Sequence, residues 1–234
     1  LKRADLVFFQ NPDDQALFRE LGLVASGAPT RVVNGSGIDT ASFEQTPLPK
    51  GPLRFLLIAR LLGDKGIREY VAAAREVRAL HPEIEFHLVG GLDPNPDAIS
   101  KEEAQSWHDE GVVIWHGALS DVRPAIAESH VYVLPSYREG TPRTVLEAMA
   151  MGRPVITTDA PGCRETVVDG DNGYLVPVRS VDSLVEAMLR FIENPELIPK
   201  MGARARQIAE EKYDVHKVNE VMLKAMGLYD QATD

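Results

Sequence analysis

The sequence is short of thiols and of paired metal ligands. Its single cysteine, Cys163, excludes a disulfide within the chain and any metal site built from several thiolates, and it is typical of a reducing compartment. We expect Cys163, within PGCRE, to be a small packing residue rather than a nucleophile. The six histidines show no metal-ligand spacing, so we expect no zinc site.

Long apolar runs and excess positive charge are also missing. Apolar stretches such as FLLIA at 55–59 are far shorter than the ~20 residues that cross a bilayer. The first ten residues, LKRADLVFFQ, contain no methionine and no secretory cleavage pattern, so we expect a piece of a longer protein. The formal net charge of −10 argues against a nucleic-acid partner. We expect a cytoplasmic location, with peripheral contact at the inner face of a membrane only through a segment outside this chain.

The central part of the chain alternates between short apolar runs and amphipathic stretches. Apolar strands without strict alternation, separated by amphipathic helices, predict a parallel sheet covered on both faces, which is a doubly wound α/β fold. Further helices are expected to follow the sheet at the C-terminal end. The expected strands are 53–59, 84–90, 112–117 and 131–135, and the expected helices are 63–80, 101–110, 121–129, 181–194, 195–212 and 215–228.

The two ends of the chain have a different character. Residues 4–10 predict a short strand, followed by a helix that opens at Asn11 or Pro12 and ends at Gly22. Residues 24–52 are rich in glycine, proline and small polar residues and predict a linker. In the last expected helix we predict an exposed apolar stripe made of Val218, Val221, Met222 and Met226.

The segment EGTPRTVLEAMAMGRPVI, residues 139–156, says most about function. Thr141 is a good helix N-cap and Pro142 suits the first helical position. The amides of the next three residues, 143–145, should then lack intrahelical partners and face the space before the helix. A pyrophosphate placed there gains hydrogen bonds and the positive end of the helix dipole.

Two carboxylates flank this helix start. Glu147 lies roughly 9 Å along the axis from the start of the helix, at about 1.5 Å per residue, and can accept the hydroxyls of a ribose. Glu139 is free to face the sugar beyond the phosphates. Two such glutamates could instead be dipole complements on a solvated surface. The flanking strands make the segment a βαβ unit with Glu139 at a strand's carboxyl end, which favours a nucleotide-sugar site.

The segment resembles the donor-binding motif of family 4 retaining glycosyltransferases, which have the GT-B fold. Two more segments resemble the same family in the expected order: VVNGSGIDTASF, and ARLLGDKG with Arg60 and Lys65. The resemblance covers essentially the whole chain as the C-terminal, donor-binding half of such an enzyme. It implies three units: 1–51 as the tail of an N-terminal acceptor domain plus a linker, 52–195 as the Rossmann-like donor domain, and 196–234 as helices that cross back.

The resemblance also implies roles for single residues. Glu139 contacts the donor sugar and Glu147 the ribose, while Arg60 and Lys65 stabilise the leaving diphosphate without a metal. Gly37 lines the inter-domain cleft, Gly90 contacts sugar or phosphate, and the edge at His116 and Gly117 meets the base through backbone groups. Arg60 and Lys65 could instead be solvent-facing ends of a turn, and the glycines and His116 could be purely structural. The remaining expected donor-binding residues surround the helix start: Gly140, Thr141, Arg143 and Thr144.

These residues predict a hexosyltransferase. We expect transfer of a hexose or N-acetylhexosamine from a nucleotide diphosphate sugar, UDP-linked by the resemblance, to a glycan or lipid-linked acceptor in surface polysaccharide synthesis. No cofactor and no metal are expected, and the chain alone should bind donor but transfer no sugar. Two alternatives stay open: a nucleotide-sugar epimerase of the same fold, and a non-catalytic nucleotide-sugar-sensing module.

Overall fold

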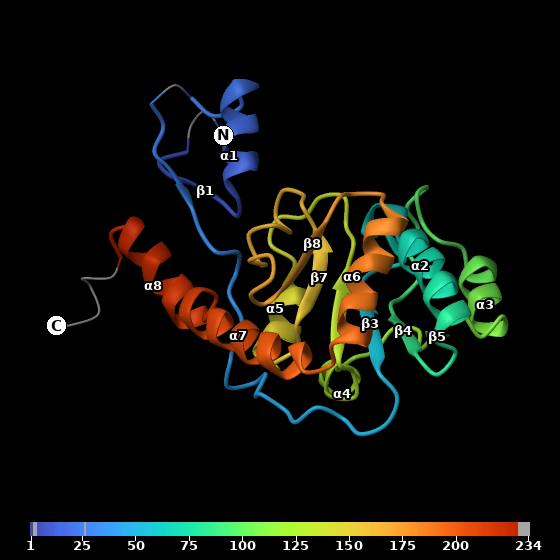
Figure 1. Cartoon of the computed structure of the whole chain (residues 1–234). Coiled ribbons are helices and arrows are strands. Elements are labelled where there is room, and N and C mark those ends of the chain that lie inside the picture. Colours follow the sequence, from blue (N-terminus) through green and yellow to red (C-terminus); the bar gives the residue numbers. More distant parts are fainter. Residues whose placement is uncertain (2–3, 26, 229–234) are drawn as a thin grey trace.

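A six-stranded, all-parallel sheet forms the centre of the computed structural model, which describes residues 1, 4–25 and 27–228. The sheet order is β5-β4-β3-β6-β7-β8 (Figure 1). Apart from the edge strand β5, these strands consist mainly of buried side chains, as expected where both faces of a parallel sheet are covered. The strands are β3 (Arg54–Ile58), β4 (Glu85–Val89), β5 (Ile114–Trp115), β6 (Val131–Leu134), β7 (Val155–Thr158) and β8 (Gly173–Val176).

Helices cover both faces of this sheet (Figure 1). Phe55 and Leu57 of β3 belong to one buried cluster, and their neighbours Leu56 and Ile58 belong to a second one, because successive side chains alternate between faces. This arrangement confirms the predicted doubly wound α/β fold. The first face carries α2 (Ile67–Leu80), α3 (Lys101–Asp109) and α6 (Val181–Glu193), and the second carries α4 (Arg123–Ala127), α5 (Arg143–Ala150) and α7 (Leu197–Lys212).

A small N-terminal unit lies apart from the main sheet (Figure 1). In it, β1 (Val7–Phe9) pairs in parallel with β2 (Thr30–Val32), and α1 (Pro12–Glu20) connects them. Asn11 is the N-cap of α1, as expected. The segment from residue 24, which was expected to be a linker, contains the strand β2. Its three residues include no buried side chain, so the sequence carries no apolar run that would reveal it.

The long helix predicted from residue 63 starts later than expected. Gly63–Lys65 form a turn of 3-10 helix, and α2 begins only at Ile67. Gly66 separates the two with a left-handed φ of 69°, and a Cβ there would lie 2.1 Å from the carbonyl oxygen of Pro135. This close approach, which only glycine permits, brings Lys65 to the end of β6.

The last helix, α8 (Val215–Ala225), extends away from the sheet (Figure 1). The predicted exposed stripe was wrong for Val218, which is buried, while Met222 is half-buried and Val221 and Met226 are exposed. Val218 and Val221 line a hollow of about 330 Å³ together with the end of β2. The N-terminal unit therefore supplies part of the apolar surface against which α8 lies.

The remaining predictions about the whole chain have different outcomes. Cys163 is a packing residue as expected, because it is fully buried and burial raises the pKa of its thiol to about 11. Within the described residues, no helix is both long and apolar enough to cross a membrane. The division into three units stays a prediction. Residues 2, 3 and 26 of its first unit and residues 229–234 of its last lie outside the described residues.

Candidate functional site

The chain reverses its order in the sheet between β3 and β6, which are neighbours. Ligands of doubly wound sheets bind beyond the carboxyl ends of the strands at such a switch point. Lys65 follows β3 and Glu139 follows β6, and Lys65 Nζ lies 2.6 Å from Glu139 Oε1. Each of the two side chains is only 16% exposed. The structure therefore brings two of the predicted site residues into a partly desolvated ion pair.

The carboxylate of Glu139 is held at one of its two oxygens. Ser136 Oγ donates to Oε1 across 2.7 Å, beside the bond from Lys65. No hydrogen bond reaches Oε2 from the residues that the structure describes, so this oxygen is available to a sugar hydroxyl. Sequence reasoning missed Ser136. A serine directly after the apolar strand expected at 131–135, where ligands of such sheets bind, is the sequence signal that could have found it.

The start of α5 differs from the prediction. The helix begins at Arg143 with Pro142 in the N-cap position and no side-chain cap, so Thr141 is not the N-cap. Instead, Thr141 donates two hydrogen bonds to Gln10 of the N-terminal unit. Its amide donates to Gln10 Oε1 and its hydroxyl donates to the carbonyl oxygen of Gln10. The amide of Val145 is not free either, because it donates to the carbonyl of Pro142 across 3.1 Å. Of the three amides expected to face a phosphate, those of Arg143 and Thr144 remain without an acceptor among the described residues.

Glu147 is a buried carboxylate in an otherwise apolar stretch of α5. It is 7% exposed, and it lies within a run of six buried residues, 145–150. Its Oε1 accepts from Arg143 Nε across 3.1 Å, and Arg143 itself is 69% exposed. Burial raises the pKa of Glu147, although the nearby guanidinium opposes the shift. A desolvated carboxylate with so little compensation is a common mark of a binding site.

Thr144 faces the interior at the start of α5. Its Oγ1 lies 2.7 Å from the hydroxyl of Tyr132, which also lies 3.0 Å from the carbonyl oxygen of Ile58. Tyr132 is fully buried, and burial raises the pKa of its phenol far above the usual range. This chain of contacts ties the first turn of α5 to β3 and β6.

Three other predicted residues have structural contacts of their own. Arg60 is 69% exposed and pairs with Asp93 of the loop after β4 at 2.8 Å. A Cβ at Gly90 would lie 1.9 Å from the carbonyl oxygen of Ala59, and one at Gly37 would lie 2.7 Å from Val215 Cα. Both glycines are therefore required by close backbone packing. A ligand role for them stays a prediction.

The side chain of His116 is engaged away from the strand ends. Its ring stacks on that of His87 with centroids 5.1 Å apart, and His87 Nδ1 lies 2.9 Å from His116 Nε2. Burial lowers the pKa of both histidines, so the pair is mainly neutral near pH 7. The carbonyl oxygen of Gly117 accepts a hydrogen bond from the amide of Gly90 across 2.8 Å. Base recognition by the backbone at this edge stays a prediction.

No group of three or more His, Cys, Asp or Glu side chains suited to a metal ion occurs in the described part of the chain. The site thus consists of a cation, two carboxylates and a helix start. Such a set can bind a diphosphate together with the hydroxyl groups attached to it.

Comparison with known proteins identifies the family. Residues 39–208, most of the chain, match the family model described as glycosyl transferases group 1. The chain belongs to this family. The match includes Arg60, Lys65, Glu139 and Glu147 and stops before α8.

Relatives and solved structures agree with this family. The chain is 30% identical to the N,N'-diacetylbacillosaminyl-diphospho-undecaprenol alpha-1,3-N-acetylgalactosaminyltransferase of Campylobacter jejuni, over 98% of this chain and 61% of the relative. It superimposes on a sucrose-phosphate synthase of Thermosynechococcus elongatus with a TM-score of 0.83, at 25% identity and over 100% of this chain and 60% of that one. Anabaena HepE in complex with UDP-glucose gives a TM-score of 0.82 at 21% identity, over 97% of this chain and 65% of that one. The chain therefore spans about three fifths of the length of these proteins.

Proposed function

We propose that this chain is the C-terminal, donor-binding half of a family 4 retaining glycosyltransferase that uses a UDP-linked hexose or N-acetylhexosamine. The observation that carries the proposal is the Lys65–Glu139 pair at the switch point of the sheet. A cation there suits a diphosphate, and a carboxylate beside it suits the hydroxyls of the attached sugar. Membership of the group 1 family supports the same assignment.

Each residue of the site then has a definite role. Glu139 accepts a sugar hydroxyl at Oε2, and Glu147 accepts the ribose hydroxyls from within α5. Lys65 meets the diphosphate, with the amides of Arg143 and Thr144 at the start of the helix. Arg60 can join them because its guanidinium is 69% exposed and can turn from Asp93 towards a bound diphosphate.

The proposed reaction retains the configuration at the sugar carbon. An acceptor hydroxyl oxygen bonds to C1 on the same face from which the C1–O bond to the diphosphate breaks, and the hydroxyl proton passes to the leaving phosphate oxygen. The products are a glycoside and UDP. Lys65 and the helix-start amides stabilise the negative charge that grows on the leaving group, so the reaction needs no metal or other cofactor.

The names of the relatives guide the choice of donor and acceptor. The Campylobacter relative is named for transfer to a sugar carried on a polyprenol diphosphate, and HepE has been solved with UDP-glucose. We therefore infer a UDP-sugar donor and a glycan or lipid-linked acceptor in surface polysaccharide synthesis. We also infer a cytoplasmic location, which agrees with the acidic net charge and the single buried cysteine. No observation favours the epimerase or the sensing module.

Calorimetric titration of the chain with UDP, GDP and ADP tests the proposal. We expect selective UDP binding that weakens at least tenfold in Lys65→Met and in Glu147→Gln. Arg75→Ala is the matched control, because it removes an exposed charge from α2 that pairs with Glu110 on the surface. Binding of no nucleotide, or equal UDP binding in all four proteins, would overturn the donor site. Sugar transfer by this chain alone would overturn its assignment as a half-enzyme.

A further inference from the structure

The loop that carries Glu139 is bound by the turn that precedes α1. Asn11 is fully buried, and its Nδ2 donates to Asp14 Oδ2, across 2.9 Å, and to the carbonyl oxygens of Glu139, across 3.3 Å, and of Gly140, across 3.1 Å. Its Oδ1 accepts from the amide of Asp14 across 2.7 Å, which caps α1. A single side chain thus joins the first turn of α1 to the backbone of Glu139, 128 positions away.

The backbone around Glu139 is closely packed. A Cβ at Gly162 would lie 2.1 Å from the carbonyl oxygen of Glu139, and a Cβ at Gly140 would lie 2.3 Å from Gln10 Oε1. The Glu139 amide donates to the carbonyl of Pro161 across 2.9 Å. Glu139 is therefore enclosed between the loop at 161–162 on one side and the Gln10–Asn11 turn on the other.

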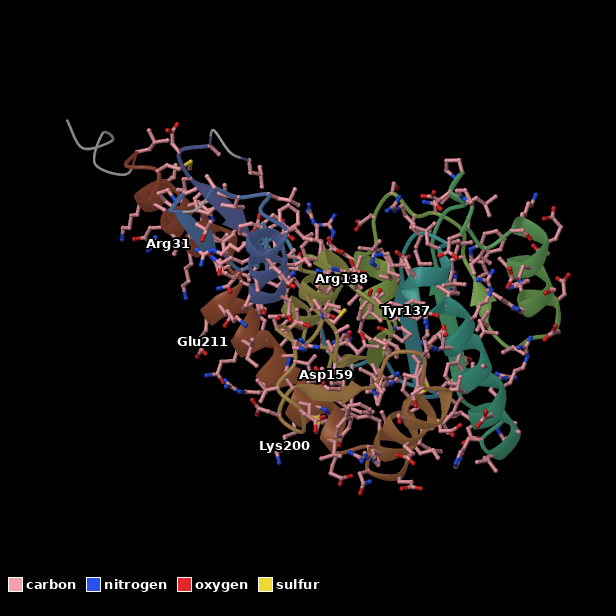
Figure 2. The ribbon with its side chains drawn as sticks, turned by 90° about the horizontal axis from the view of Figure 1, so that it is seen from above. Arg31, Tyr137, Arg138, Asp159, Lys200 and Glu211 are labelled. Carbon is pink, nitrogen blue, oxygen red and sulfur yellow. The ribbon has the colours of Figure 1, made fainter. Side chains whose placement is uncertain are left out.

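Ion pairs surround this contact at the surface. Arg138 pairs with Asp14, and Arg164 Nη1 lies 3.1 Å from Asp13 Oδ2. Figure 2 shows Arg138 beside α1. These four side chains are between 24% and 49% exposed, so each pair is screened by solvent and contributes little. The buried bonds of Asn11 therefore contribute more to the placement of the loop than these ion pairs do.

We propose that Asn11 is a positioning residue for Glu139, and that the placement of α1 thereby controls how the carboxylate meets the donor sugar. Asn11 fixes the backbone of Glu139, while Lys65 and Ser136 fix Oε1. Together they leave Oε2 at a defined point above the strand ends. The inference rests on the proposed function only for the identity of the group that Oε2 meets.

Two variants separate this role from simple helix capping and docking. Asn11→Ser keeps an N-cap oxygen for α1 but loses the amide that donates to the two carbonyls. Asp13→Asn is the matched control, because it weakens the pair with Arg164 in the same turn and leaves the Asn11 bonds in place. Thermal melting of both variants should confirm that each one is folded.

The first readout is amide hydrogen exchange followed by NMR, which needs no ligand. We expect the Glu139 amide to exchange at least tenfold faster in Asn11→Ser than in the unchanged protein, with α1 amides unaffected. Asp13→Asn should leave the exchange of Glu139 within twofold. Equal exchange of Glu139 in Asn11→Ser and the unchanged protein would overturn the inference.

The second readout compares UDP with UDP-glucose and UDP-N-acetylglucosamine by calorimetry. Asn11→Ser should raise the Kd of the tightest-binding UDP-sugar by about three- to tenfold. It should change the Kd of UDP less than twofold. A purely structural defect would change both alike, and that result, like an unchanged UDP-sugar affinity, overturns the positioning role. If the unchanged protein binds neither UDP nor UDP-sugars, the proposed function fails, and the exchange result still decides whether Asn11 orders the Glu139 loop.

Discussion

Replacing Glu147 by glutamine should make the protein more stable and its donor site weaker. Glu147 is 7% exposed within a run of buried residues of α5, and its carboxylate pairs with the exposed guanidinium of Arg143. The loss of hydration of the Glu147 carboxylate is therefore only partly offset by hydrogen bonds, and burial raises its pKa. Glutamine keeps the shape of the side chain and removes the buried charge.

The expected gain in stability follows from these contacts. Relieving a destabilised functional group commonly raises the free energy of unfolding by about 0.5–2 kcal/mol. Loss of the i,i+4 pair with Arg143 lowers it by about 0.2–0.5 kcal/mol. We expect a net gain of about 1 kcal/mol at pH 7.5, or roughly 2–4 °C in melting temperature for a chain of this size.

The pH dependence provides an internal control for this prediction. The pKa of Glu147 is raised in the folded protein, so the folded state binds the Glu147 proton more tightly than the unfolded state does. This difference stabilises the folded protein fully below the ordinary pKa of 4.5. That contribution is lost as the pH rises through the raised pKa of the folded state. The variant should therefore match the unchanged protein near pH 4 and exceed it at higher pH, as measured by urea denaturation.

The same substitution should weaken UDP binding. A hydrogen bond to a charged group contributes about 1.5–3 kcal/mol, so loss of the charge should reduce affinity roughly 10- to 150-fold. Calorimetry at pH 7.5 measures this change. A variant that is less stable at pH 7.5, or one that binds UDP as tightly as the unchanged protein, would refute the reasoning.

Three further substitutions have expected outcomes. Arg153 is fully buried and donates to the carbonyls of Thr46, Ile126 and Met151, among others, so Arg153→Met should lower the free energy of unfolding by about 3–5 kcal/mol in urea titrations. Gly66→Ala should lower the melting temperature by several degrees, because its Cβ meets a carbonyl oxygen at 2.1 Å. Burial lowers the pKa of His130 in the folded protein. The stabilisation that comes from neutral His130 should therefore be complete above about pH 6.5 and be lost as the pH falls through the lowered pKa of the folded state. His130→Gln should show a shallower loss of unfolding free energy over the same pH range.

The fold was predictable because its signals are local. Each short apolar strand and each amphipathic helix of the central sheet is visible as a run or a period in the sequence, and most boundaries agree within a few residues. β2 was missed because its three residues bury no side chain. The start of α2 was misplaced because the reason for Gly66 is the carbonyl of Pro135, which is remote in sequence.

The sequence by itself determined the residue types of the candidate site and their order along the chain. Glu139 and Glu147 lie on one helix-loop segment, so their spacing is a local property of the backbone. Only the tertiary structure decided which groups meet. It pairs Lys65 with Glu139, directs Arg60 to Asp93, and sets Asn11 against the Glu139 backbone. These contacts join segments far apart in the chain, and their partners are fixed by the strand order of the sheet and by where the N-terminal unit docks.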